Sequence, residues 1–366
     1  METAKRQCEG RAAPTERRIR RPVRRGLMYL AAGAAILIAA LWLVGALKAG
    51  YFVVDRHVMV PAANEPETVT VYPAEDRHFI EIDGWRVAYV DEGNGPPVLL
   101  LHGCPFSSYE WHSVIPILAQ HYRVIAPDLL GLGDTGVRLD DDYRLPNEMK
   151  MVVGLLDALG IKQARIVGHD HGGATAELLM KYHPDRIHSL VLTNVEAYDQ
   201  WPSAPETPFL KLLLNPITGP LFRLAFGLTA FQRDAYASAV YTPDHLTDEM
   251  LAAFTRPQIS TPQRYLRLRR FFHWQLDREH NLETMRAVDG MRKFDRPTLI
   301  LWGRHDTNFG PPIAERLAKD IPRVVRVQWM ENSAHLPMLE EPGAYAAALT
   351  QFFSEDEDLP KPTRQR

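Results

Sequence analysis

The chain has 366 residues, of which 46% are hydrophobic and 24% charged, an ordinary composition for a globular protein. It contains no solenoid-type repeat, and two cysteines, Cys8 and Cys104, are too few for a disulfide framework. Nine Lys or Arg against three Glu give residues 1–26 a charge of +6, which leaves −9 for the rest of a chain whose net charge is −3. A basic segment followed by an acidic body argues against nucleic acid as a partner.

An uncharged stretch of 21 residues, Leu27 to Leu47, follows the basic segment. As a helix rising about 1.5 Å per residue it spans roughly 31 Å, enough to cross the hydrocarbon core of a bilayer. The arginine-rich flank predicts a cytoplasmic tail over residues 1–26, a single lipid-contacting transmembrane anchor over residues 27–47, and an extracytoplasmic catalytic body. The alternative is export after signal cleavage near Ala46, but signal peptides usually have an apolar region of about 7–15 residues. The length therefore favours the anchor.

Residues 48–75 combine scattered prolines with polar residues and are expected to form a linker. Two alternating runs joined by Asp83-Gly84 then predict a β-hairpin. Six short apolar runs follow: PVLLLHG, YRVIAPDL, ARIVGHD, SLVLTNV, PTLILWG and VVRVQWM. Helix-length segments separate most of them. The predicted fold class is α/β, with a mostly parallel central sheet and helices on both faces.

The alternation of strands and helices breaks between Val195 and Arg296. About a hundred residues there, rich in Leu, Phe, Tyr and Arg, predict an inserted helical cap, since so long a structureless loop is uncommon in a compact domain. The expected domain limits are residues 76–195 and 286–354 for the core, 196–285 for the cap and 355–366 for a flexible C-terminal tail.

Three polar residues follow predicted strands in one chain order: Asp170 in GHDHGG, Asp306 after LILWGRH, and His335 in MENSAHLP. In open α/β sheets the carboxyl ends of the strands converge on a ligand crevice. Nucleophile, acid and histidine in this order match the arrangement of α/β hydrolases, with Asp170 where G-x-S-x-G enzymes carry serine. We therefore expect Asp170, Asp306 and His335 to be the catalytic residues.

Residues 76–354 resemble the α/β-hydrolase-fold enzymes of the haloalkane dehalogenase and epoxide hydrolase group. GHDHGG resembles the aspartate form of that group's nucleophile turn, and HGCPFSSYEW resembles its oxyanion loop, with SSYEW closest to the dehalogenase form. DLLGLGDT and SAHLPMLEEP also match. The resemblance implies a small apolar organic substrate, water as co-substrate, and neither a cofactor nor a metal.

Attack at a saturated carbon explains why a carboxylate takes the place of serine. Displacing a halide or opening an epoxide leaves an ester on Asp170, and water deprotonated by His335 can attack the carbonyl of that ester. A serine would leave an ether, which water does not readily cleave. Asp306 would orient the imidazole, and the backbone N–H groups of Cys104 and His171 would form the oxyanion hole.

Two assignments stay open. Glu196, which follows the preceding strand, is an alternative acid. The resemblance places the two halide-gripping side chains of dehalogenases at Cys104 and His171, where a thiol is a weak donor. Epoxide hydrolases use cap tyrosines instead, and the cap region offers Tyr198, Tyr236, Tyr241 and Tyr265. The candidate contacts for the leaving group or substrate are His171, Trp274, Tyr241 and Tyr265.

Carbon–halogen hydrolysis of the haloalkane dehalogenase type is the leading hypothesis from the sequence, because SSYEW and DLLGLGDT favour that branch. Epoxide hydrolysis is the close alternative. An esterase-like hydrolase that uses no serine and a non-catalytic ligand receptor on the same fold are further alternatives. The sequence has no G-x-S-x-G, and it retains nucleophile, acid and base together.

Overall fold

The computed structural model describes residues 15–53, 55–68, 72 and 76–356, and the chain divides into two units at residue 45. The first unit consists of helix α1 (Thr15–Lys48) up to Val44. The arginine-rich residues 15–26, expected in a tail, are helical, and residues 1–14 lie outside the described part. Leu30–Lys48 is long and apolar enough to cross a membrane, a property shared by signal sequences and by some core helices.

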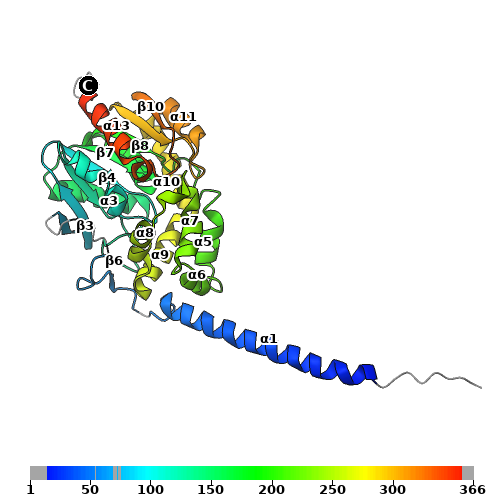
Figure 1. The fold of residues 1–366 in the computed structure, drawn as a ribbon. Helices are drawn as coiled ribbons and strands as arrows, with labels where there is room; N and C mark the ends of the chain where they lie inside the picture. Colours follow the sequence, from blue (N-terminus) through cyan, green and yellow to red (C-terminus); the bar gives the residue numbers. More distant parts are fainter. Residues whose placement is uncertain (1–14, 54, 69–71, 73–75, 357–366) are drawn as a thin grey trace, which may run out of the picture. The chain divides into compact units, whose positions relative to one another are not determined.

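An eight-stranded sheet forms the centre of the second unit (Figure 1). The strand order is β10-β9-β8-β7-β4-β5-β3-β2; β3 runs antiparallel to both β2 and β5, and all other neighbours are parallel. The predicted hairpin and all six predicted strands are confirmed. The strands are β2 (Arg77–Ile82), β3 (Trp85–Glu92), β4 (Pro97–Leu101), β5 (Arg123–Pro127), β7 (Ala164–His169), β8 (Ile187–Thr193), β9 (Thr298–Gly303) and β10 (Val324–Met330).

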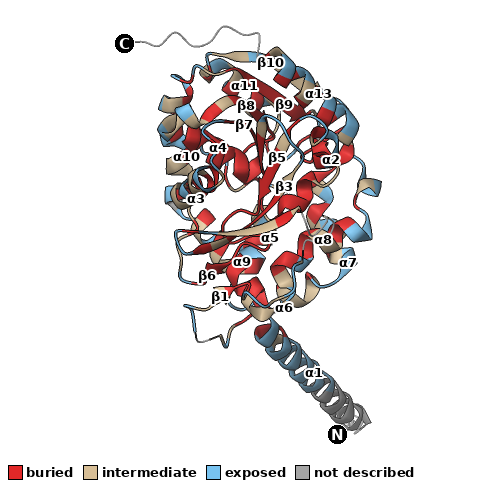
Figure 2. Cartoon of the chain, turned by 90° about the vertical axis from the view of Figure 1, so that its left-hand side faces the viewer, coloured by how far each residue is buried: buried red, intermediate tan, exposed pale blue. Residues whose placement is uncertain are grey.

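Helices cover both faces of the sheet, which explains why the central strands are almost continuously apolar and buried (Figure 2). Helices α3, α4 and α10 pack together on one side, α2 and α13 pack together on the other, and α11 packs on β9 and β10. These helices are α2 (Ile115–Leu118), α3 (Leu145–Ala158), α4 (Asp170–Tyr182), α10 (Arg278–Met291), α11 (Pro311–Asp320) and α13 (Pro342–Glu355).

The order of the central strands creates a switch point at β4. The chain passes from β4 to β5 on one side and then returns to β7 on the other side of β4. Ligands of open α/β sheets bind outside the carboxyl ends of strands at such a point. The segments that leave β4 and β7 there are residues 102–104 and the turn that contains Asp170.

Five helices between β8 and α10 form the cap, which lies together at one end of the sheet (Figure 1). They are α5 (Thr207–Leu214), α6 (Gly219–Ala225), α7 (Thr229–Tyr236), α8 (Asp248–Ile259) and α9 (Pro262–Gln275). The expected cap limit at residue 285 falls inside α10, which packs against α4 of the core. The last cap helix is therefore α9.

Part of the expected linker, residues 48–75, is built into the body. Strand β1 (Met59–Val60) pairs with β6 (Val137–Arg138), and the side chain of Glu65 accepts a 2.9 Å hydrogen bond from Arg264 of α9. Residues 54, 69–71 and 73–75 lie outside the described part. At the other terminus Asp356 is buried against Arg165 at 2.8 Å, so the expected tail, residues 355–366, begins within the body; residues 357–366 are not described.

A buried ion pair holds the DLLGLGDT motif in place. Asp128 accepts hydrogen bonds from Arg77 at 2.6 Å and from the backbone N–H groups of Ser108 at 2.8 Å and Asp134 at 2.7 Å. Burial raises the pKa of Asp128, but Arg77, His102 and these backbone donors outweigh burial and lower it to about 2. The motif thus ties the loop after β5 to the SSYEW segment.

Replacing Asp128 with Asn is expected to lower the free energy of unfolding by about 3–5 kcal/mol, because buried Arg77 loses its shortest ion pair and keeps only the longer contacts to Glu67 at 3.4 Å and Asp134 at 3.6 Å. Asp91→Asn is the matched control: its pair with Arg123 is partly exposed, so the loss should stay within about 1 kcal/mol. Denaturant unfolding of the full chain in detergent measures both. The wild-type contribution is present above about pH 3.9, the ordinary pKa of Asp, and is lost as the pH falls through about 2. Equal losses in the two variants would contradict this assignment.

Candidate active site

Asp170 lies on a sharp turn between β7 and α4. Its φ of +50° is rare for a non-glycine residue and is held by close packing on both sides. A Cβ at Gly172 would lie 2.4 Å from the carbonyl oxygen of Leu101, and one at Gly168 would lie 2.8 Å from Cα of Gly173. The glycines of GHDHGG are therefore required by steric contact, and the turn presents the Asp170 side chain at the switch point.

The three residues predicted to be catalytic form one hydrogen-bonded series. His335 Nε2 lies 3.0 Å from Asp170 Oδ2, and His335 Nδ1 lies 3.0 Å from Asp306 Oδ2. Asp306 also accepts hydrogen bonds at 2.7 Å from the Asn194 side chain and from the backbone N–H of Asn308. Burial lowers the pKa of His335, but Asp306 and Asp170 outweigh it and raise it well above its ordinary value. The ring therefore carries a positive charge between two carboxylates.

The backbone N–H groups of Cys104 and His171 lie beside this series. Within the described residues neither donates a hydrogen bond, whereas the next N–H along the turn, of Gly172, donates to His102 at 3.0 Å. A Cβ at Gly103 would lie 2.7 Å from Cβ of Asp170, so the loop after β4 reaches the turn at van der Waals distance. Two backbone N–H groups that donate no hydrogen bond within the described residues thus belong to the two loops that meet at Asp170.

Glu110, from the SSYEW motif, supports both loops. Its carboxyl accepts a 3.0 Å hydrogen bond from the Gly103 N–H and lies 2.9 Å from Nδ1 of His169, whose Nε2 lies 2.9 Å from the His335 carbonyl oxygen. Burial raises the pKa of Glu110 to about 8 and lowers that of His169 to about 3. At neutral pH the carboxyl is therefore protonated and can donate to a neutral His169. The sequence indicated the motif but not this role.

The rings of His171 and His280 both face Glu196. The Glu196 Oε1 atom lies 3.0 Å from His171 Nδ1 and 2.9 Å from His280 Nε2, and Glu148 lies 3.3 Å from the other nitrogen of His171. Glu196 is therefore the hydrogen-bond partner of His171 and His280, whereas the partner of His335 is Asp306. Burial opposes charge on His171, but Glu148 and Glu196 outweigh it and raise its pKa well above the ordinary value.

His171, Glu196 and His280 also have ligand atoms within 4.8 Å of one another, a spacing that suits a metal ion. Both ring N–H groups, however, point at the same carboxylate oxygen with hydrogen-bond geometry. The cluster is therefore a buried hydrogen-bonded network, and it begins at His171, the residue after Asp170.

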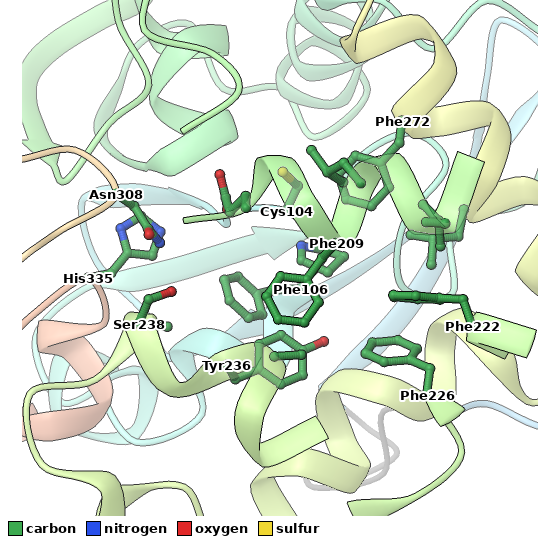
Figure 3. Close-up of a pocket in the computed structure, with 17 residues that line it drawn as sticks. Cys104, Phe106, Phe209, Phe222, Phe226, Tyr236, Ser238, Phe272, Asn308 and His335 are labelled. Atoms are coloured by element: carbon green, nitrogen blue, oxygen red, sulfur yellow. The ribbon is translucent and has the colours of Figure 1, made fainter. Parts of the chain in front are cut away.

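A cavity of about 710 Å³, including the part open to solvent, lies between the cap and this site (Figure 3). Its walls are mostly apolar, formed by Phe106 and by side chains of α5, α6 and α9 such as Phe209, Phe222 and Phe272. The size and lining suit a small organic ligand. The polar or weakly polar side chains at the wall are Cys104, Glu206, Tyr236, Ser238, Asn308 and His335.

The side chains expected to contact the leaving group lie outside this lining. The His171 ring is held by Glu148 and Glu196, and Trp274 lies under Arg144, with 5.2 Å from the guanidinium carbon to the ring centre. Tyr241 is half exposed and stacks on a histidine, and the Tyr265 hydroxyl donates to the Gly219 carbonyl at 3.1 Å. None of these four side chains is therefore part of the cavity wall.

Two residues of the cap region, Tyr236 and Glu206, bring polar groups to the cavity wall. Tyr236, one of the four cap tyrosines, lines the cavity and packs against Phe106 with ring centres 6.0 Å apart. Glu206 lines the same wall, and its carboxyl accepts a 2.5 Å hydrogen bond from the Ser203 hydroxyl. Burial and the negative charge of Asp170 raise the pKa of Glu206 to about 7. No motif marks Glu206 among the acidic residues of the cap.

Comparison with known proteins identifies the family. The model of the alpha/beta hydrolase fold matches residues 96–342. The chain belongs to the α/β-hydrolase fold family. Within this family it is an enzyme of the haloalkane dehalogenase and epoxide hydrolase group.

The relatives of this α/β hydrolase carry both activities in their names. It is 29% identical over 292 residues to haloalkane dehalogenase 2 of Mycobacterium tuberculosis, which covers 77% of this chain and 96% of the relative. It is 36% identical over 132 residues to a soluble epoxide hydrolase of Corynebacterium sp., covering 34% of this chain and 45% of the relative. The crystal structure of an ancestral haloalkane dehalogenase superposes with a TM-score of 0.66 at 24% identity, covering 77% and 100% of the two chains, and supports the fold.

Proposed function

We propose that this hydrolase cleaves a bond at a saturated carbon through a covalent ester of Asp170. The observation that supports it most strongly is the series Asp170–His335–Asp306, in which His335 lines an apolar cavity, with two unused backbone N–H groups on the loops that meet at Asp170. The carboxylate is the nucleophile, the imidazole is the base for water, and Asp306 orients it. Cys104 and His171 supply the oxyanion hole through their backbone.

The leaving group that the cavity suits best is an oxygen, as in an epoxide. Of the side chains expected at the halide, the His171 ring and the cap candidate Trp274 are outside the cavity lining, and Cys104 lines it with a thiol, which is a weak donor. Glu206 and the Tyr236 hydroxyl are also part of the lining. At a pKa of about 7 the Glu206 carboxyl is protonated in about half of the molecules at neutral pH. An alkoxide leaving group requires such a proton, and a halide does not.

The proposed first step is attack by Asp170 on an epoxide carbon. The carbon–oxygen bond breaks, and the alkoxide takes a proton from Glu206. Esterification removes the charge of Asp170, which is one of the two charges that raise the pKa of His335. The imidazolium therefore becomes more acidic and returns a proton to Glu206, which leaves His335 neutral and able to act as a base.

In the proposed second step His335 removes a proton from water, and the hydroxide attacks the ester carbonyl. The N–H groups of Cys104 and His171 stabilise the resulting oxyanion. Collapse expels the alkoxide of the product, which takes the proton of the newly formed Asp170 carboxylic acid. The diol leaves, and the three side chains regain their starting charges.

Carbon–halogen hydrolysis is the second candidate. It is supported by the similarity to the Mycobacterium tuberculosis dehalogenase over most of that protein and by the amide of Asn308, which lines the cavity and can donate a hydrogen bond to a halide. Incubating the full chain with matched pairs of 1-bromoalkanes and terminal 1,2-epoxyalkanes distinguishes the two. Diol formation without bromide release supports epoxide hydrolysis, and bromide release without diol formation contradicts it.

Glu206→Gln is expected to slow epoxide opening by roughly 10²- to 10⁴-fold, the usual contribution of a general acid. The wild-type rate should fall as the pH rises through about 7, because the protonated carboxyl is present below its pKa and is lost above it. The variant should lack this decline. Single-turnover rates between pH 5 and 9 measure it, with Ser238→Ala, a hydroxyl on the same cavity wall, as the control. An identical decline in both enzymes would exclude Glu206 as the donor.

We also propose that the apolar end of α1 is a retained membrane anchor, with the body outside the cytoplasm. The arginine-rich flank supports this orientation. Ala46 and Ala49, next to the site where a signal peptidase would cut, are fully buried in the body. The end of the helix is thus part of the folded enzyme, which favours retention over cleavage.

A further inference from the structure

Exposed apolar side chains gather on one part of the second unit. Among its described residues, eleven large hydrophobic side chains are exposed, and six of them come from just two short segments, residues 47–52 and 212–228. These are Leu47, Phe52, Leu212, Ile217, Leu221 and Leu228. Ile217 is 71% exposed and Leu228 63% exposed. Large exposed apolar patches of a folded protein mark sites of contact with other proteins or with membranes.

Contacts bring the two segments together. Gly45 packs so tightly on α6 that a Cβ there would lie 2.2 Å from the carbonyl oxygen of Pro220. The Tyr51 hydroxyl donates a 3.1 Å hydrogen bond to the carbonyl oxygen of Pro216, in the loop between α5 and α6. The chain therefore enters the body at α6, which lies at the end of the cap farthest from the sheet (Figures 1 and 2).

We infer that the surface formed by the six side chains named above, four of them from the cap, lies in the interface of a phospholipid bilayer. Residues 45–48, the end of the apolar stretch of α1, belong to the second unit, so a bilayer that holds the preceding part of this stretch begins where the chain enters the body, at α6. Lys48 and Lys211 are exposed beside the apolar side chains. Lysines in this position can lay their apolar stems along the hydrophobic surface and extend their charged ends to the headgroups.

The same short helices line the cavity with their inner faces. On α5, Leu210 and Leu213 line the cavity while Leu212 is exposed, and on α6 Phe222 lines it while Leu221 is exposed. One layer of helix thus separates the proposed lipid surface from the active site. The substrate class that fits is a lipophilic, long-chain molecule that partitions into the bilayer and passes between α5 and α6. This second part rests on the function proposed above, whereas the lipid contact does not.

Spin labels on the full chain in anionic phospholipid vesicles test the contact independently of activity. A nitroxide is placed at Ile217→Cys or, as matched control, at Val325→Cys on β10, which is similarly apolar and 41% exposed. Cys8→Ser removes one of the two native thiols, and the other, Cys104, is buried. We expect the ratio of collisions with oxygen to collisions with a water-soluble nickel complex to be several-fold higher at residue 217 than at residue 325. Equal, water-like ratios at both positions overturn the inference.

Ile217→Asp combined with Leu221→Asp tests the substrate route. Neither side chain lines the cavity. Turnover of a long-chain epoxide supplied in vesicles should fall several-fold, while turnover of a short, water-soluble epoxide should stay unchanged. Equal losses for both substrates, or none, overturn the route. A lipid signature at residue 217 together with no turnover of any epoxide or haloalkane would refute the proposed function and leave the lipid contact standing.

Discussion

Replacing His335 with Gln is expected to stop the reaction after its first step and to leave the substrate bound to Asp170 as an ester. The imidazole is the only described side chain within hydrogen-bond distance of both Asp170 and Asp306. Glutamine can occupy the space, but it cannot take a proton from water. Ester formation needs only the carboxylate and the proton donor, so it should continue.

The steady-state rate of His335→Gln should fall by on the order of 10⁴-fold or more, as when a catalytic base is removed from a hydrolase. Intact-mass spectrometry after substrate exposure should show one added substrate mass, localised to the peptide that contains Asp170. His305→Gln is the control, because that ring precedes Asp306 on the loop after β9 but stacks on Tyr241 and is not part of the cavity lining. An unmodified His335→Gln protein that has lost its activity would show that the histidine is needed before any bond is formed.

Asp170→Asn should abolish both ester formation and turnover, with a loss of on the order of 10⁴-fold or more. The amide has nearly the same shape as the carboxylate and keeps a contact to His335 Nε2, which lies 3.0 Å from Asp170 Oδ2. It is a far weaker nucleophile. The measurement combines steady-state rates with intact mass, which should show no added mass.

Asp170→Ala provides a second variant, because an Asn in this site can revert to Asp by hydrolysis. Asp306→Asn is the informative comparison, since it weakens the orientation of His335 but leaves the nucleophile intact. If Asp170→Ala retained substantial turnover, the nucleophile would have to be another group, such as a directly activated water.

The sequence predicted the fold well where the pattern is local. Buried strands such as Ala164–His169 read as continuous apolar runs, and the glycines of GHDHGG mark a turn that a Cβ would block. The order of Asp170, Asp306 and His335 along the chain also predicted their proximity, because parallel strands end at the same edge. Strand β1 could not be predicted from the sequence. Its two residues are too few to show an alternating pattern of apolar and polar side chains, and its partner β6 is far away in the chain.

The chemistry at the cavity wall was harder to predict, because it depends on how the cap packs. Glu206 belongs to no motif. It immediately precedes α5, and the packing of the cap brings it to the cavity wall, close enough to Asp170 for that charge to raise its pKa. His171 follows Asp170 in sequence, which made its ring a candidate for contact with the leaving group. Its ring is instead directed to Glu148 and Glu196, two carboxylates on separate segments. No spacing in the sequence reveals that pairing.

One turnover in water enriched in heavy oxygen tests the ester of Asp170 most directly. With enzyme in excess over substrate, the hydroxide attacks the carboxyl carbon of Asp170, so the heavy atom should be retained in that side chain. The first product molecule should carry only ordinary oxygen from the enzyme. Peptide mass spectrometry should therefore find one heavy oxygen in the peptide that contains Asp170. Heavy oxygen in the product and none in that peptide would mean that water attacks the substrate itself, and would contradict the proposed mechanism.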